Sequence, residues 1–309
     1  MPRRAALLFV LAACCAPARE SPTLKNEYAE VNGVRLHYVT AGKGPLIVFL
    51  HGFPEFWYEW KTQLPEFAKD HRAVAPDMRG YNPSAKPEGV DHYQMNHLVE
   101  DVRALADHLG YKKFILVGHD WGGAVAWSFA IAHPEYLEKL VIINCPHPAI
   151  LARELAQNPA QQKASQYMLF FRSPQAEQTL AANNYAGLVD AVLGEGLKTG
   201  VFTEADKQAY IEAWSQPGAL TGGLNYYRAA NLGPPTSSQE VVAPVGNLLV
   251  KVPTLVIWGD KDTALLTGNL DGMDKFVPNL TIKRIPDGSH WVIHEKPELV
   301  NQYIRDFIR

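Results

Sequence analysis

The feature that most constrains the fold is a series of short, continuously apolar segments, most of them rich in β-branched residues. They are LIVFL (46–50), RAVAP (72–76), FILVG (114–118), KLVII (139–143) and TLVIW (254–258). Strands that are buried on both faces have this composition, and parallel sheets are buried on both faces. Five residues are also too few for a helix of ordinary length. The segments therefore predict a mostly parallel central sheet.

Helical patterns lie between these strands. Apolar residues recur every three or four positions in 97–110, 123–133 and 297–308. Near the start of the chain, residues 31–42 alternate apolar and polar side chains and end in glycine, which predicts a half-exposed strand. Alternation of strand and helix is typical of an α/β fold, with helices flanking the sheet.

One region of about a hundred residues breaks this alternation. From 147 to 247 the strand-like runs vanish, and helix-like segments such as LARELAQ, AGLVDAVLGEGL and EADKQAYIEAW take their place. Such a stretch is far too long for a simple connection. We predict a helical cap at 147–247, inserted between two parts of one α/β core at 27–146 and 248–309, over the sheet edge where ligands bind in such folds.

The first twenty residues have the layout of a signal peptide. Arg3 and Arg4 precede an apolar run at 5–13 that ends in small residues and is too short to span a bilayer. The end of the run, Leu11-Ala12-Ala13-Cys14, resembles a bacterial lipobox, which would make Cys14 a lipid anchor; a plain signal cut near 16–18 is the alternative. Either way we expect the protein to be exported: periplasmic, secreted or lipid-anchored. No later segment reaches the roughly 18 apolar residues of a membrane span.

Composition excludes several kinds of function. A net charge of −3 offers no basic surface for nucleic acid. Outside the leader, Cys145 is the single cysteine, so the chain has neither an internal disulfide nor a cysteine-based zinc set. Cys145 follows an apolar strand, which favours a packed thiol over a nucleophile. We predict that the protein uses no metal and no cofactor.

The stretch VGHDWGG (117–123) has the form of the G-x-S-x-G nucleophile elbow, with Asp120 in place of serine. A predicted strand precedes it and a predicted helix follows it, which is the context that the elbow requires. The nucleophile of an elbow sits on a strained, tightly packed turn, and the glycines Gly118, Gly122 and Gly123 suit that turn. Asp120 is therefore the candidate nucleophile.

The two sides of the elbow suggest an oxyanion hole. The backbone N–H of Trp121, at the start of the helix, is one candidate donor. The second is the N–H of Phe53 in HGFP (51–54), which follows the strand at 46–50. We interpret His51 as a residue that shapes this loop, in preference to a catalytic base.

An acid and a histidine are expected after the nucleophile in chain order. Asp260 and Asp262 directly follow the strand at 254–258, and either could be the acid. His290, in IPDGSHW, comes just after the last strand-like segment and is the candidate base. Each residue alone is weak support, because a loop aspartate or histidine is usually a solvated polar group.

An aspartate nucleophile suits a particular kind of target. A carboxylate with a pKa near 4 is already ionised at neutral pH, so it needs no base to attack a saturated carbon that bears a leaving group. The product is an ester on Asp120. His290, oriented by the acid, could then activate water against the ester carbonyl, with the two N–H groups stabilising the oxyanion.

Across residues 27–309 the chain resembles the α/β-hydrolase-fold epoxide hydrolases. The resemblance lies in HGFPEFWYEW, DMRGYNPSAKP, VGHDWGG, WGDKD and DGSHW. It implies an aspartate nucleophile, a histidine–acid pair and two cap tyrosines that hydrogen-bond the epoxide oxygen. It also favours Asp262 over Asp260 as the acid.

The resemblance places both tyrosines. Tyr167 lies in SQYMLFFRSP (165–174) and Tyr227 in LNYYRAANL (224–232). The neighbouring Tyr226 stays open, but in a helix the two side chains would point about 100° apart, so one of them should face the site. A tyrosine is protonated at pH 7 and can donate a proton to the alkoxide of an opening epoxide.

Haloalkane and fluoroacetate dehalogenases share this fold and nucleophile, so a dehalogenase is the main alternative. Fluoroacetate dehalogenases carry His-Trp where this chain has Tyr167-Met168, and many haloalkane dehalogenases have Asn at the position of Phe53. A non-catalytic binding protein on this fold is the second alternative. The chain contains no G-x-S-x-G motif, which argues against a carboxylesterase.

The expected wall of the substrate site is apolar. We predict that Phe53, Trp121 and Met168 bind the substrate, which is then an apolar epoxide converted to a vicinal diol. Phe56 and Trp57 are further candidates for this wall, or else structural packing.

Overall fold

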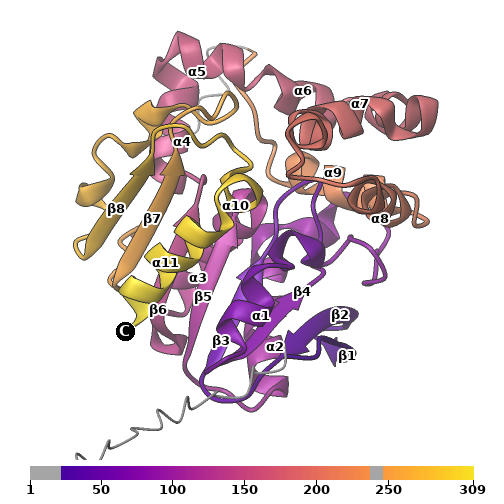
Figure 1. Cartoon of the computed structure of the whole chain (residues 1–309). Helices are drawn as coiled ribbons and strands as arrows, with labels where there is room; N and C mark the ends of the chain where they lie inside the picture. The colour runs from indigo at the N-terminus through magenta and orange to yellow at the C-terminus, as the bar shows by residue number, and fades with distance from the viewer. Residues whose placement is uncertain (1–21, 237–245) are drawn as a thin grey trace, which may run out of the picture.

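The computed structural model describes residues 22–236 and 246–309, so the predicted leader and Cys14 lie outside the described residues. In this part of the chain eight strands form one sheet, in the order β1-β2-β4-β3-β5-β6-β7-β8 (Figure 1). The pairs from β4 to β8 are parallel, whereas β1–β2 and β2–β4 are antiparallel. The strands are β1 Lys25–Val31, β2 Val34–Ala41, β3 Leu46–Leu50, β4 Arg72–Pro76, β5 Phe114–His119, β6 Leu137–Ile143, β7 Thr254–Gly259 and β8 Leu280–Ile285.

The first predicted strand was wrong in its extent and exposure. Residues 31–42 do not form one half-exposed strand: Asn32 and Gly33 make a turn between β1 and β2, with φ of 47° and 75°. Asn-Gly is the typical two-residue hairpin turn, because both residues accept positive φ. Apart from Arg35, β2 is buried, because its side chains join the cores on both faces of the sheet, Leu36 and Tyr38 on one face and Val39 and Ala41 on the other.

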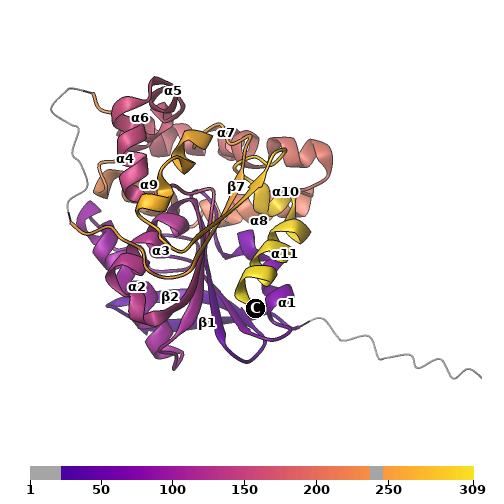
Figure 2. The ribbon, with the colours of Figure 1, turned by 90° about the vertical axis from the view of Figure 1, so that its left-hand side faces the viewer.

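Alternate side chains of the sheet enter two separate cores. Leu116 and Ile142 pack with α2 and α3, and their chain neighbours Ile115 and Val141 pack with α1 and α11. Figure 2 shows these helix layers on opposite sides of the sheet. The core helices are α1 Gln63–Phe67, α2 Met95–His108, α3 Asp120–Ala132, α10 Val292–Glu295 and α11 Pro297–Ile308. Short 3₁₀ helices are η1 Trp57–Trp60, η2 Val90–Tyr93, η3 Pro134–Tyr136, η4 Thr267–Leu270 and η5 Met273–Lys275.

A helical insert between β6 and β7 covers one end of the sheet (Figures 1 and 2). Its helices are α4 Pro148–Gln157, α5 Pro159–Ala164, α6 Gln166–Arg172, α7 Ala176–Thr199, α8 Glu204–Trp214 and α9 Ala219–Ala229; α7 is interrupted at 182–185 by non-helical backbone. The predicted α/β-hydrolase architecture, a mostly parallel sheet with an inserted helical cap, is confirmed. None of the described helices is long and apolar enough to cross a membrane.

Candidate active site

Asp120 lies on a sharp turn between β5 and α3, with a φ of 48°. This left-handed conformation is uncommon outside glycine and marks functional strain. Two glycines allow the turn. A Cβ on Gly122 would lie 2.1 Å from the carbonyl oxygen of Leu50, and one on Gly118 would lie 2.4 Å from that of Gly122. The elbow thus needs glycine because neighbouring backbone occupies the space of a side chain.

The Asp120 carboxylate faces two groups from other elements. Its Oδ1 accepts a hydrogen bond of 2.8 Å from the N–H of Phe53, and its Oδ2 lies 3.7 Å from Nε2 of His290. Phe53 thus holds the position of the predicted oxyanion donor. Trp121 follows Asp120 in the first turn of α3, where amides have no intrahelical partner. Its role as second donor stays a prediction.

His290 is held by Asp262. Its Nδ1–H donates to Oδ2 of Asp262 at 2.7 Å, while the other carboxylate oxygen accepts from the N–H groups of Ala264 and Leu265 at 2.8 and 2.9 Å. Asp260 instead accepts from Arg284 at 2.8 Å, on the neighbouring strand β8. The structure therefore brings Asp262, and not Asp260, to the histidine.

The charges around His290 favour its protonated form. Burial lowers its pKa, but the negative charges of Asp262 and then Asp120 outweigh burial and raise the pKa to about 9. Burial likewise raises the pKa of Asp262, yet the charge and hydrogen bond of His290 hold the net value below its usual range. At neutral pH the structure thus favours an imidazolium between two carboxylates.

Both predicted tyrosines line a small cavity of about 40 Å³ together with Asp120. Tyr167 comes from α6 and Tyr227 from α9, and their ring centres lie 6.3 Å apart. Tyr226 points elsewhere: its hydroxyl donates to the carbonyl of Arg79 at 2.8 Å. Burial raises the pKa of Tyr167 and of Tyr227 well above the ordinary value, and the charge of Asp120 adds to it. Both phenols are therefore protonated at neutral pH.

Of the three residues expected to bind the substrate, Trp121 and Met168 line this cavity. The ring of Phe53 is not among the described residues that line it; it packs edge-on against Tyr227 and Phe171, with ring centres 5.6 and 5.1 Å away. Phe53 therefore contributes its backbone to the site, and its side chain supports the wall from behind.

Phe56 and Trp57 have structural packing roles and do not form the wall of the substrate site. Phe56 stacks on Tyr58 and contacts Tyr210 of α8, so it joins the core to the cap. Trp57 donates its backbone N–H to Oδ1 of Asp77 at 2.9 Å, and its ring packs edge-on against Phe56. Neither is among the described residues that line the cavity at Asp120.

His51 and Cys145 have the positions expected of non-catalytic groups. His51 is buried; its Nε2 accepts from the N–H of Met78 at 3.0 Å and its Nδ1–H donates to the carbonyl of Gly52 at 2.8 Å. Cys145 is 5% exposed, and burial raises the pKa of its thiol well above the ordinary value. The thiol lines the cavity as a neutral, compact group.

Three polar residues that were not predicted from the sequence contact the acid and the histidine of the site, directly or through one another. Asn144 donates to Oδ2 of Asp262 at 2.8 Å. His119 donates from Nε2 to the carbonyl of His290 at 2.9 Å, and its Nδ1 contacts the Glu59 carboxyl group. Burial, and then the charge of Glu55, raise the pKa of Glu59 well above its usual value, whereas burial lowers that of His119 to about 4.

These shifts favour a neutral glutamic acid beside a neutral histidine. Glu59 could have been noticed in HGFPEFWYEW, because an acidic residue between tryptophans and phenylalanines is expensive to bury as an anion. Asn144 directly follows the strand at 139–143, and that position at the end of a parallel strand is the signal that could have found it.

Glu55, Glu59 and His294 place one potential metal-ligand atom each within 4.8 Å of one another. Glu55 and His294 already form an ion pair of 3.1 Å, and the Tyr210 hydroxyl donates to the same carboxylate at 3.0 Å. Their interactions with each other account for this cluster.

Residues 45–297 match the family described as the alpha/beta hydrolase fold. Epoxide hydrolase 4 of Mus musculus is 38% identical over 90% of this chain and 77% of its own length. The chain belongs to the α/β-hydrolase-fold epoxide hydrolase family.

Two further relatives are similar over nearly their whole length. The AB hydrolase superfamily protein YfhM of Bacillus subtilis is 41% identical, over 93% of this chain and 98% of its own. A crystal structure of an epoxide hydrolase from Bacillus megaterium, complexed with its product (R)-3-[1]naphthyloxy-propane-1,2-diol, superposes with a TM-score of 0.87. That chain is 40% identical to this epoxide hydrolase family member, over 91% of this chain and 99% of its own.

Proposed function

We propose that this family member hydrolyses an epoxide to a vicinal diol through an ester on Asp120. The observation that carries the proposal is the convergence of one carboxylate and two neutral phenols on a single cavity. A carboxylate can attack the epoxide carbon, and a phenol can protonate the oxygen that leaves it. The membership in the epoxide hydrolase family and the diol bound to the Bacillus megaterium enzyme support the same reaction.

In the first step an oxygen of Asp120 forms a bond to a ring carbon, and the C–O bond of the epoxide breaks. The alkoxide takes a proton from Tyr167 or Tyr227. If Oδ2 attacks, Oδ1 becomes the ester carbonyl oxygen, which already accepts the N–H of Phe53. That carbonyl is then polarised for the second step.

In the second step a water attacks the ester carbonyl carbon, and His290 takes the proton of that water. The tetrahedral oxyanion accepts hydrogen bonds from the N–H groups of Phe53 and Trp121 and then collapses. The ester C–O bond to the alkyl group breaks, the carboxyl proton passes to the leaving diol oxygen so that Asp120 is a carboxylate again, and the proton held by His290 returns to the tyrosinate. The charge of Asp120 is one cause of the raised pKa of His290. Because the ester removes that charge, formation of the intermediate lowers the pKa, so the imidazolium releases its proton and leaves a neutral histidine that can accept the proton of water.

The test is mass spectrometry of the His290→Gln protein after exposure to epoxides and, in parallel, to haloalkanes. We expect Asp120 to gain the mass of the epoxide and the ester to persist, since the water-activating group is gone. In unmodified protein, a single turnover in heavy-oxygen water should label Asp120. A label found in the diol and never in Asp120 would overturn the covalent route, and halide release without diol formation would identify a dehalogenase.

We also propose that the protein is exported, on the basis of the leader pattern at residues 1–20. The N-terminal residue and mass of the mature chain test this proposal. A chain beginning at a lipidated Cys14 supports a lipid anchor, one beginning near residue 18 supports a plain signal, and an uncut Met1 contradicts both.

A further inference from the structure

Arg228, which directly follows Tyr227 on α9, joins the helices that carry the two tyrosines. Its Nη1 and Nη2 donate to the two carboxylate oxygens of Glu177, in the first turn of α7, at 2.7 and 2.8 Å. Nη2 also donates to the backbone carbonyl of Ser173 at 3.2 Å, where α6 ends. Because α6 carries Tyr167, one guanidinium group connects both tyrosine helices to each other and to the start of α7.

This set of contacts suits arginine in particular. A guanidinium is a planar fork of five N–H donors, so it can bind both oxygens of a carboxylate and still donate to a carbonyl. A lysine would keep the positive charge but not the fork. The side chains of Arg228 and Glu177 are only 17% and 31% exposed, and the hydrogen bonds from Arg228 hold the pKa of Glu177 below its ordinary value. The ion pair is therefore a fixed, partly buried contact.

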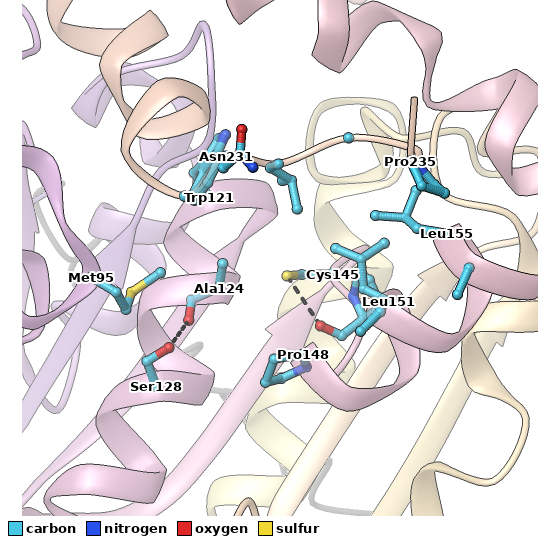
Figure 3. A pocket seen from close by; sticks show the side chains of 16 residues that line it. Met95, Trp121, Ala124, Ser128, Cys145, Pro148, Leu151, Leu155, Asn231 and Pro235 are labelled. Atoms are coloured by element: carbon cyan, nitrogen blue, oxygen red, sulfur yellow. Dashed lines mark hydrogen bonds between the residues drawn. The ribbon is translucent and has the colours of Figure 1, made fainter. Parts of the chain in front are cut away.

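Close packing does not hold the end of α9 on every side. A cavity of about 510 Å³ lies beside the segment that continues from α9, and Figure 3 shows Asn231 and Pro235 of this segment along it. Trp121, which also lines this cavity, packs edge-on against the ring of Tyr227, with ring centres 5.0 Å apart. Tightly packed neighbours resist the movement of a helix, and a cavity does not. The hydrogen bonds of Arg228 therefore have to hold this end of α9 in place.

We propose that Arg228, together with Glu177, is a positioning residue that holds the hydroxyl groups of Tyr167 and Tyr227 where the epoxide oxygen is released. The inference rests on the proposed function, because it concerns the proton donors of the same reaction. A proton donor has to lie within hydrogen-bond reach of its acceptor, and a displacement of about 1 Å can slow a reaction by about 10²-fold. The attack of water on the ester uses groups of the α/β core, so ring opening is the step that depends on Arg228.

The first experiment measures the two steps separately in Arg228→Met, which removes the guanidinium and keeps a long side chain. Followed by single-turnover mass spectrometry with 1,2-epoxypropane, formation of the Asp120 ester should slow by about tenfold to 10²-fold, while decay of the ester should be nearly unchanged. The matched control is Arg103→Met on α2, because Arg103 also binds two carboxylates, Glu100 and Asp107, at 2.6 and 2.7 Å. It should keep both rates. Equal slowing of both steps, or the same loss in the control, would overturn the proposal.

A second experiment tests whether protonation is what the variant loses. The trifluoromethyl group of 1,1,1-trifluoro-2,3-epoxypropane withdraws electrons and stabilises the alkoxide, so its ring opening needs less proton donation than that of 1,2-epoxypropane. The slowing of ester formation in Arg228→Met should therefore be at least about threefold smaller for the fluorinated epoxide. The same slowing with both epoxides would mean that the variant misplaces the substrate or the nucleophile, and would contradict the proposal.

A third experiment tests whether the two residues act as one unit. Glu177→Gln keeps the shape of the side chain and removes its charge. The double variant with Arg228→Met should form the ester no more slowly than Arg228→Met alone, whereas independent roles would multiply the two defects and contradict a joint function. Arg228→Lys should show an intermediate rate, because it keeps the charge and loses the fork. If Arg228→Met does not fold, Arg228→Lys and Glu177→Gln decide through the same two rates.

The two proposals fail in different ways. If the unmodified protein forms no ester and no diol from either epoxide, the proposed function is wrong. If the unmodified protein turns both over and the folded Arg228→Met variant forms the ester at the same rate, the reaction stands and the role of Arg228 is wrong.

Discussion

The α/β core and the helical cap meet at the same cavity, but they hold their groups in different ways. On the core side, backbone geometry places Asp120: a positive φ, two glycines without room for a Cβ, and the N–H of Phe53. On the cap side, the two phenols depend on side-chain packing between helices.

Contacts between α9 and its surroundings show how the cap side is held. Arg228 of α9 pairs with Glu177 of α7 at 2.7 Å, and Tyr226 donates to the carbonyl of Arg79. A Cβ on Gly222 would lie 2.3 Å from the carbonyl oxygen of Gly80, so α9 packs directly on core backbone. In the proposed reaction the core supplies a nucleophile and a base suited to any saturated carbon with a leaving group, whereas the cap selects a leaving oxygen.

The largest expected effect lies on the core side. Asp120→Ala removes the attacking atom, so we expect diol formation to fall by a factor on the order of 10⁴ or more. The matched control is Asp260→Ala, because that carboxylate pairs with Arg284 away from the histidine and should stay near the unmodified rate. Turnover measured on a reactive epoxide checks both. A comparable loss in the control would mean that the acid has been assigned to the wrong aspartate.

The cap side should show a smaller effect that is specific to ring opening. Changing Tyr167 and Tyr227 together to Phe removes both proton donors, and we expect formation of the Asp120 ester to slow by about 10² to 10⁴-fold. Single-turnover kinetics measures that step. Tyr226→Phe is the control, since its hydroxyl bonds to Arg79 and should affect stability by only about 0.5–1.5 kcal/mol. Full activity of the double variant would show that the cap does not protonate the oxygen.

The free energy of unfolding tests how tightly backbone packs around the elbow. In Gly122→Ala the new methyl group meets the carbonyl oxygen of Leu50 at 2.1 Å, so the elbow has to shift. We expect the free energy of unfolding to fall by about 1–3 kcal/mol or more. Gly187→Ala in α7 is the matched control, because a Cβ there meets nothing within 4 Å. Equal denaturant midpoints for the two variants would contradict a tightly packed elbow.

The smallest effect is a change in one pKa. Asp120 contributes to the raised pKa of His290, about 9, so Asp120→Asn should lower it by removing a negative charge that favours the imidazolium. Asp262→Asn should lower it further, because Asp262 is the larger cause. NMR titration of the imidazole measures both. A pKa that stays near 9 in Asp120→Asn would remove the proposed link between ester formation and base activation.

Much of the core could be predicted from sequence because its signals are local. A continuous apolar run predicts the strand at 254–258, a three- and four-residue periodicity predicts the helix at 297–308, and a strand-turn-helix context predicts the elbow. The hairpin at Asn32-Gly33 was missed although the signal was present, since a run of alternating residues was extended through its turn. No local sequence signal indicated the packing roles of Phe56 and Trp57, because the same aromatic residue can face a cavity or a neighbouring helix without any change in the sequence around it.

By itself the sequence determined which reactive groups are available: an aspartate at an elbow, followed in chain order by an acid and a histidine. It left two choices open, Tyr226 or Tyr227 in the cap and Asp260 or Asp262 after β7. The tertiary structure decided which neighbour meets the site. Asp262 reaches His290 while Asp260 turns to β8, and Tyr227 faces the cavity while Tyr226 faces Arg79. The physical reason is that residues one or two apart point in different directions, so only the packing of distant segments determines which of them reaches the substrate.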